Sequence, residues 1–310
     1  MLLPYGPVGD SANMNAVEVA GVSKSFNATK VVDDLSFTCQ AGVILGMLGP
    51  NGAGKTTTMR MLMDIIKPDT GEVRVFGLPP NERTKDSIGY LPEERGLYRK
   101  LTVSDCLGYL ASLKSMSSSA ARSRAQELLV HVGMAQHQHK KIEELSRGMS
   151  QLVQFVATIL HDPALVVLDE PISGLDPVNA KMLKDMLAGL RQQGKCVILS
   201  THLMNEVEEL CDRVLMINRG KAVLYGRVSE VEARYRNNSV FFEGGNLPEK
   251  IPGAARRTQR GQCWELFLDE RADPQQVLAS LLGSGVRIDR FEVATPSLNE
   301  IFIRVAEQSR

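Results

Sequence analysis

The chain lacks an excess of charge of either sign. Its 310 residues include 36 Lys and Arg and 36 Asp and Glu, so the formal net charge at pH 7 is zero. Proteins that bind nucleic acid over a broad surface usually carry a clear basic excess. The charge balance therefore argues against such a footprint, although a small local basic patch is compatible with it.

Paired cysteines and long apolar runs are lacking as well. The five cysteines are scattered without a C-x-x-C pair, which argues against a disulfide framework or a zinc site and favours reduced thiols. No stretch approaches the roughly 18–20 apolar residues that cross a bilayer. Residues 1–15 lack the charged start and apolar core of a signal peptide, so we expect a flexible extension there. These absences predict a protein that stays in the cytoplasm.

Short and nearly all-apolar stretches recur along the chain and predict an α/β domain. Each is typical of a strand buried on both faces of a parallel sheet, and helical patterns lie between them. Near the start, two segments alternate apolar and polar residues before a glycine turn, as antiparallel strands do. The buried stretches are 43–48, 164–169, 196–201 and 213–218, and the alternating ones are 16–26 and 31–42.

Two further regions complete the predicted architecture. Thr102 is a candidate helix N-cap with Asp105 three residues on, and an apolar stripe follows that we expect to pack internally. After about residue 236 the chain becomes rich in turn residues, and then shows a strand–helix–strand–helix pattern that predicts a separate small α+β unit. The stripe consists of Val103, Cys106, Leu107, Leu110 and Leu113.

A glycine-rich stretch, GPNGAGKTT, follows the first buried strand and precedes a helix-like run. It fits G-x-x-x-x-G-K-[ST], in which backbone N–H groups and a helix N-terminus wrap nucleotide phosphates. Lys55 is expected to reach the β- and γ-phosphates, and the Thr56 hydroxyl to bind Mg²⁺. The predicted nucleotide-binding residues are Gly49, Pro50, Asn51, Gly52, Ala53, Gly54, Lys55, Thr56 and Thr57.

Two acids end the buried strand at 164–169. Asp169 is expected to be paired with a cation, because a carboxylate at a buried strand end is costly otherwise, and it is predicted to hold Mg²⁺ through water. Glu170 comes next and is predicted to polarise the attacking water as a general base.

The phosphate loop is followed by LSRGMSQ at 145–151, LVVLDEPISGLDP at 165–177 and ILSTH at 198–202. In order and spacing this set resembles the nucleotide-binding subunit of an ATP-binding cassette (ABC) transporter. The stretches IGYLPEERGLY at 88–98 and PSLNEIF at 296–302 resemble the ATPases of sodium-efflux and multidrug-type exporters.

The resemblance implies a P-loop ABC-ATPase core with a mixed sheet, an antiparallel β subdomain and an inserted helical subdomain. It places the ATPase domain at residues 16–236, with the helical subdomain at about 95–160. A small α+β C-terminal accessory domain follows at 240–310, and the N-terminal extension covers 1–15.

The same resemblance implies further roles. Phe26 would stack on adenine, and His202 would contact the γ-phosphate and hold the water with Glu170. Asp176 would communicate between two subunits, and it can also cap the next helix. Glu93 stands where many relatives have a glutamine that approaches Mg²⁺; a carboxylate can still ligate the ion.

The stretch at 145–151 departs from the common Leu-Ser-Gly-Gly-Gln form, because Arg147 replaces its first glycine and Met149 its glutamine. Ser146 and Gly148 remain, and they supply a hydroxyl and an open backbone at a helix N-terminus. The resemblance implies that these two residues close over the γ-phosphate held by a second subunit.

The leading hypothesis is the ATP-hydrolysing subunit of an ABC transporter, with ATP and Mg²⁺ as cofactors. Its partners would be a second ATPase subunit, identical or not, and a separately encoded membrane permease. The protein would lie on the inner face of the cell membrane through that permease, and would energise export by dimer closure. The alternatives are a soluble ABC ATPase acting on ribosomes or nucleic acid, and a P-loop kinase or GTPase. The sequence has no N-K-x-D motif for guanine.

Overall fold

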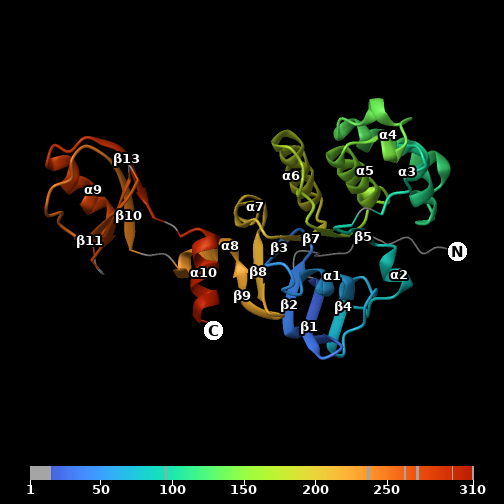
Figure 1. Cartoon of the computed structure of the whole chain (residues 1–310), viewed down its shortest axis with the longest axis horizontal. Helices are drawn as coiled ribbons and strands as arrows, with labels where there is room; N and C mark the ends of the chain where they lie inside the picture. Colours follow the sequence, from blue (N-terminus) through green and yellow to red (C-terminus); the bar gives the residue numbers. More distant parts are fainter. Residues whose placement is uncertain are drawn as a thin grey trace. The chain divides into compact units, whose positions relative to one another are not determined.

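The computed structural model describes residues 15–94, 96–235, 238–261, 263–269, 272–294 and 296–308. Apart from Asn15, the predicted N-terminal extension lies outside the described residues. The chain separates into two compact units, one ending at Val228 and the other beginning at Ser229 (Figure 1). Each unit has its own sheets and core, so each is described by itself.

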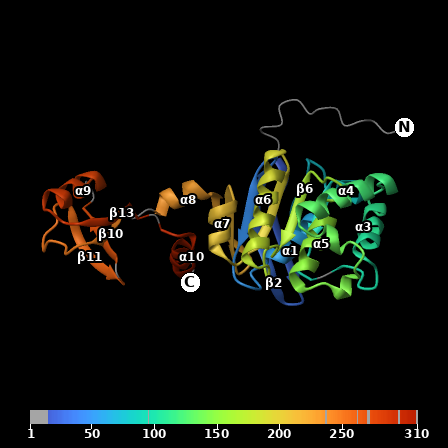
Figure 2. The same ribbon diagram turned by 90° about the horizontal axis from the view of Figure 1, so that it is seen from above.

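Six strands form the central sheet of the first unit in the order β5-β6-β7-β3-β8-β9. Neighbours are parallel except β8 and β9. Strands β3, β6 and β7 are buried throughout because α5, α6 and α7 cover one face while α1 and a second sheet cover the other (Figures 1 and 2). This double cover is why their sequences are continuous apolar runs. The elements are β3 (Ile44–Leu48), β5 (Ile88–Leu91), β6 (Leu165–Asp169), β7 (Cys196–Thr201), β8 (Arg213–Asn218), β9 (Lys221–Arg227), α1 (Lys55–Leu62), α6 (Pro177–Gln192) and α7 (Met204–Leu210).

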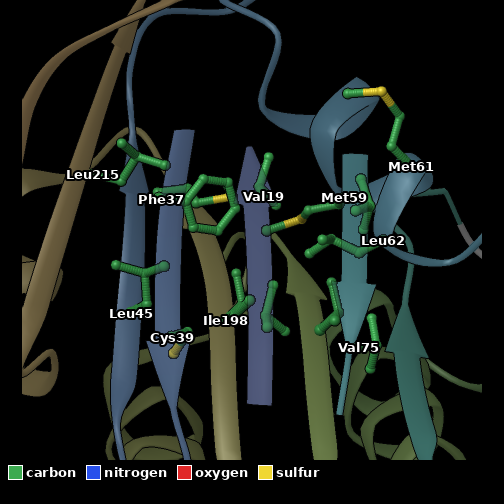
Figure 3. Close-up of a cluster of buried hydrophobic side chains, with 14 of the residues drawn as sticks. Val19, Phe37, Cys39, Leu45, Met59, Met61, Leu62, Val75, Ile198 and Leu215 are labelled. Atoms are coloured by element: carbon green, nitrogen blue, oxygen red, sulfur yellow. The ribbon is translucent and has the colours of Figure 1, made fainter. Parts of the chain in front are cut away.

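The second sheet is antiparallel and has the order β2-β1-β4. Its inner side chains form one core with α1 and the central sheet, in which Phe37 packs near Met59, Leu45 and Ile198 (Figure 3). Because one face of this sheet is solvated, its strands alternate buried and exposed positions as predicted. The strands are β1 (Asn15–Phe26), β2 (Thr29–Gln40) and β4 (Thr70–Val75), and the short α2 (Glu82–Lys85) follows β4.

Helices α3, α4 and α5 are inserted between β5 and β6. Thr102 caps α3 as predicted, since its hydroxyl accepts from the Asp105 backbone N–H at 3.1 Å. The predicted apolar stripe is buried only in part: Val103, Cys106 and Leu107 are buried, whereas Leu113, the C-cap of α3, is 60% exposed because the described residues do not cover this end of the helix. The elements are α3 (Val103–Ser112), α4 (Ser118–His131), α5 (Arg147–Ile159) and the short 3₁₀ helices η2 (Ala135–His137) and η3 (Ile142–Glu144).

The second unit is built on a four-stranded antiparallel sheet with the order β11-β12-β10-β13. Helix α9 packs its buried Val277 and Leu281 on the core formed by Val240, Phe242 and Leu266. Strands β10 and β11 were not predicted from the sequence, because the glycines and prolines around them are typical of turns. The elements are α8 (Val228–Tyr235), β10 (Ser239–Gly244), β11 (Ala254–Arg260), β12 (Cys263–Leu268), α9 (Pro274–Gly283), β13 (Ile288–Val293) and α10 (Leu298–Gln308).

The architecture confirms the predicted fold class. A mixed parallel core, an antiparallel sheet and inserted helices make up the first unit, and a small α+β unit follows. Within the described residues, none of the helices combines the length and apolarity needed to cross a membrane.

Candidate active site

The phosphate loop connects the end of β3 to the start of α1. Gly52 and Gly54 have φ values of 78° and 108°, which residues that carry a side chain rarely adopt. A Cβ on Gly54 would also lie 2.7 Å from the backbone oxygen of Val31. The glycines are therefore required for the loop to fold tightly. Helix α1 begins without a side-chain cap and without an acid in its first turn, so its N-terminal N–H groups point into the loop uncompensated.

A cavity of about 350 Å³ opens in front of this loop. The phosphate loop forms one side of it, and carboxylates from the ends of β5 and β6 form the other. Its polar lining and its size suit an anionic ligand held by backbone N–H groups. The lining residues are Val31, Asn51, Gly52, Ala53, Gly54, Lys55, Thr56, Thr57, Glu93, Asp169 and Glu170.

Lys55 is the cation of this cavity. Its Nζ donates to the backbone oxygens of Gly49 at 2.7 Å and Pro50 at 3.3 Å. Burial lowers the pKa of Lys55 below its ordinary value of 10.5, and the nearby carboxylates, Glu170 first, oppose that shift. A buried ammonium facing carboxylates across a cavity is suited to neutralise phosphate charge.

Asp169 is held by Ser200, a residue that the sequence analysis missed. Strand β7 lies between β6 and β3, and Ser200 is paired in register with Asp169. The Ser200 hydroxyl donates a short hydrogen bond to Asp169 Oδ1 and accepts one from the Glu170 backbone N–H at 3.0 Å. The signal available in the sequence was a hydroxyl ending an apolar strand, two residues before His202.

The other carboxylate oxygen of Asp169, Oδ2, is buried and has no hydrogen-bond partner among the described residues. A buried carboxylate oxygen without a donor is costly unless a cation faces it. No group of three or more His, Cys, Asp or Glu that could hold a metal by itself occurs in the described ranges. The unpartnered Oδ2 of Asp169 fits a cation such as Mg²⁺, which proteins commonly bind with one or two carboxylates plus phosphate oxygens.

Glu170 and His202 are brought together as the sequence analysis expected. His202 Nδ1 lies 3.0 Å from Glu170 Oε2 and 3.1 Å from Oε1. Burial raises the pKa of Glu170 above its ordinary value of 4.5, and the hydrogen bond with His202 opposes the shift. Glu170 also has φ 50°, a strained value for a side-chain-bearing residue, which turns its carboxylate toward the cavity.

The loop that carries His202 is anchored by two residues absent from our predictions. Thr201 donates to the buried Glu206 carboxylate at 2.7 Å, and its hydroxyl also accepts from the Leu203 backbone N–H at 3.1 Å. These bonds fix the backbone on both sides of His202, whose own side chain is half exposed.

Ser146, Gly148 and Asp176 do not line the cavity. Ser146 caps α5, accepting from the Met149 N–H at 3.3 Å. Asp176 caps α6, accepting from Val178 at 3.0 Å and from Asn179. The first turn of α5 instead lies against the loop that precedes α6, since a Cβ on Gly148 would be 3.6 Å from Leu175.

Phe26 and Glu93 complete the predicted set. Phe26 ends β1 with 43% of its surface exposed, and Lys24 Nζ lies 5.8 Å from its ring centre; it is not among the residues that line the cavity. Glu93 follows β5, is exposed and does line the cavity.

The model of the family described as "ABC transporter" matches residues 32–173. A second model, "ATP-binding protein DrrA1-3-like, C-terminal domain", matches residues 226–306. A third, "AAA domain, putative AbiEii toxin, Type IV TA system", matches residues 140–208.

Curated relatives match over nearly their whole length. The uncharacterized ABC transporter ATP-binding protein YhaQ of Bacillus subtilis is 37% identical over 285 residues, covering 91% of this chain and 95% of that one. The Nod factor export ATP-binding protein I of Rhizobium sp. (strain N33) is 34% identical, covering 94% of this chain and 96% of that one.

Solved structures share the fold of the first unit. An ATP-binding subunit of an ABC transporter superposes with a TM-score of 0.67 at 26% identity, covering 71% of this chain and 93% of that one. A bacterial ABC transporter cassette solved as a dimer superposes with a TM-score of 0.64 at 21% identity, covering 68% of this chain and 98% of that one.

Proposed function

Because this chain belongs to the ATP-binding subunits of ABC transporters, which bind and hydrolyse ATP, we propose that it energises export through a separate membrane permease by closing as a dimer around ATP. The direction of transport is supported by the Nod factor export relatives. That these relatives are transporter subunits favours transport over action on ribosomes or nucleic acid.

The proposed hydrolytic site is the cavity in front of the phosphate loop. Its N–H groups and Lys55 bind the β- and γ-phosphates, while Glu170, oriented by His202, accepts a proton from the attacking water. Mg²⁺ would be held by Thr56, Asp169 and Glu93, and when bound it neutralises charge on the phosphates. Phe26 is proposed to stack on adenine, because it is an exposed aromatic side chain at the end of β1.

The proposed dimer rests on one observation. The cavity is lined by the phosphate loop, Asp169 and Glu170, but by no residue of the stretch 145–151. The first turn of α5 carries no acid, so its positive end is not neutralised within its own turn. We propose that Ser146 and Gly148 complete the ATP site of a second cassette, and that Asp176 lies near that interface. Cassettes of this fold that were solved as dimers support this arrangement.

The proposed permease surface lies on the inserted helices. Tyr98 and Tyr109 are both exposed by more than 40% and meet edge to face at 5.0 Å between ring centres. Close by, Leu110 and Leu113 border a cavity of about 310 Å³ with Leu97. Aromatic and leucine side chains gathered in this way are typical of protein interfaces. Docking there would hold the ATPase at the inner face of the cell membrane.

The domain division is part of the proposal. We propose an ATPase domain over residues 16–236 and an accessory domain over 240–310, and the separate core of the second unit supports an accessory domain. The compact units divide earlier, between Val228 and Ser229. Residues 1–15 are proposed as an extension without a role in ATP binding.

The test is Glu170→Gln, which keeps the size of the side chain and removes its capacity as a base. With ATP, size exclusion of the variant should show a doubling of mass, and ADP should not support it. The matched control is Glu249→Gln, an exposed glutamate of the second unit, which should behave as the wild type. A Glu170→Gln variant that binds ATP and stays monomeric would refute the dimer mechanism.

A further inference from the structure

Arg147 is the first residue of α5 and is exposed. A cation at a helix N-terminus is unfavourable, because it repels the positive end of the dipole. No acid lies in the first turn of α5, and no ion pair or hydrogen bond joins the Arg147 side chain to another residue in the described part of the chain. Helix stability therefore does not account for an arginine at this position.

The Arg147 side chain lies across the backbone of Gly174. A Cβ on Gly174 would be 3.0 Å from Arg147 Nε, 3.3 Å from Cζ and 3.6 Å from Cδ. Gly174 also has φ 78°, so the loop can turn there only with glycine. The guanidinium thus occupies space that exists because residue 174 has no side chain.

Two further contacts join α5 to the same loop. Gln151, one turn further along α5, is buried and donates to the Pro171 backbone oxygen at 3.1 Å. Gly148 approaches the Gly174 backbone oxygen, which a Cβ on it would meet at 3.9 Å. The loop contacted at these points begins directly after Glu170, whose own backbone is strained and held by Ser200. A shift of the first turn of α5 would therefore reach Glu170 through a packed backbone segment.

We propose that Arg147 is a positioning residue, which clamps the loop after Glu170 to the first turn of α5. This inference rests on the proposed dimer. There, Ser146 faces the ATP of the partner cassette, whereas Glu170 faces the ATP of its own chain. Through the contact between Arg147 and Gly174, ATP bound in one site would set the placement of the catalytic carboxylate in the other.

A direct contact of Arg147 with the partner's phosphate is a different role, and mixed dimers separate the two. Two full-length chains with different affinity tags are mixed with ATP, and dimers that contain one of each are isolated. One chain of such a mixed dimer carries Glu170, and the other carries Glu170→Gln. Only one site then hydrolyses, and Mg²⁺ starts a single turnover measured as phosphate release. Arg147→Ala is placed either on the chain that carries Glu170 (the cis dimer) or on the Glu170→Gln chain (the trans dimer).

Clamping predicts that the cis dimer releases phosphate at least about 10-fold more slowly, since a catalytic group displaced by about 1 Å can cost up to 100-fold. The trans dimer should stay within about twofold of the unsubstituted mixed dimer. Slowing confined to the trans dimer would overturn the inference in favour of direct phosphate contact. The inference would also be overturned if phosphate release were slowed equally in the cis and trans dimers, or if it were slowed in neither.

Arg122→Ala is the matched control, because Arg122 is an exposed arginine on α4 of the same helical region. Its cis and trans dimers should both release phosphate at the unsubstituted rate. If mixed dimers do not form with ATP at all, the proposed dimer mechanism fails and the inference fails with it. Dimers that form and retain ATP, but show no difference between cis and trans, refute the role of Arg147 alone.

Discussion

Ser200→Ala tests whether the two acids of the active site depend on one buried hydroxyl. The Ser200 side chain is fully buried and serves two groups, Asp169 Oδ1 and the Glu170 backbone N–H. Removing the hydroxyl leaves both groups without this hydrogen-bond partner. Each buried group left unsatisfied costs roughly 1–3 kcal/mol, more when charged. We therefore expect the free energy of unfolding to fall by about 2–4 kcal/mol.

The same change should lower kcat by about 10- to 100-fold with KM for ATP changed less than about threefold, because Asp169 and Glu170 lose their placement while the phosphate loop is untouched. Unfolding in urea is followed by circular dichroism, which reports mainly on the larger first unit. The chain's single tryptophan, Trp264, lies in β12 and reports on the second unit by fluorescence.

Ser36→Ala is the control. The exposed Ser36 hydroxyl accepts one backbone N–H, from Gly21 at 2.8 Å, so water can replace it and the cost should stay below about 1 kcal/mol. A Ser200→Ala protein with the stability and kcat of the wild type would refute the reasoning that this hydroxyl orders the acids.

Three further predictions follow from the site. First, burial raises the pKa of Glu170 in the protein without nucleotide, and the proposed base acts deprotonated, so kcat/KM should rise with pH with a midpoint above 4.5. The folded pKa exceeds the unfolded one, so the contribution of Glu170 to stability falls as pH rises through that window; a kcat/KM profile with its midpoint at or below 4.5 would contradict this. Second, Ser146→Arg should abolish hydrolysis with ATP affinity of the monomer, measured by calorimetry, within about twofold of the wild type; loss of that affinity would place Ser146 in its own chain's site. Third, Gly54→Ala should abolish ATP binding because its Cβ would meet the Val31 backbone oxygen at 2.7 Å, whereas a Cβ on Gly52 meets no atom within 4 Å. Gly52→Ala should therefore lower the free energy of unfolding only by the backbone strain, roughly 1–3 kcal/mol. Gly54→Ala should lower it further because of the steric clash, so equal thermal stability of the two variants would count against the steric argument.

Local patterns were sufficient for the fold class and for the phosphate loop. The loop motif, the buried strand before it and the helix after it are contiguous in the chain, so Lys55 and Thr56 could be placed without knowledge of distant residues. The acids Asp169 and Glu170 could be assigned for the same reason, because they end a continuous apolar run. Conversely, β10 and β11 were missed because neighbouring glycines and prolines obscured their alternation.

The tertiary structure decided which distant residues meet. Ser200 serves Asp169 only because β7 lies between β3 and β6, an order that the chain does not follow in sequence. Leu113 was predicted to pack internally and is exposed, because burial at the end of α3 depends on which distant segments cover it. The sequence by itself thus determined which charged groups line the cavity in front of the phosphate loop, since Lys55, Asp169 and Glu170 lie in short motifs. The support of that site, including Arg147 on Gly174, was decided by strand order and loop packing, which no local pattern encodes.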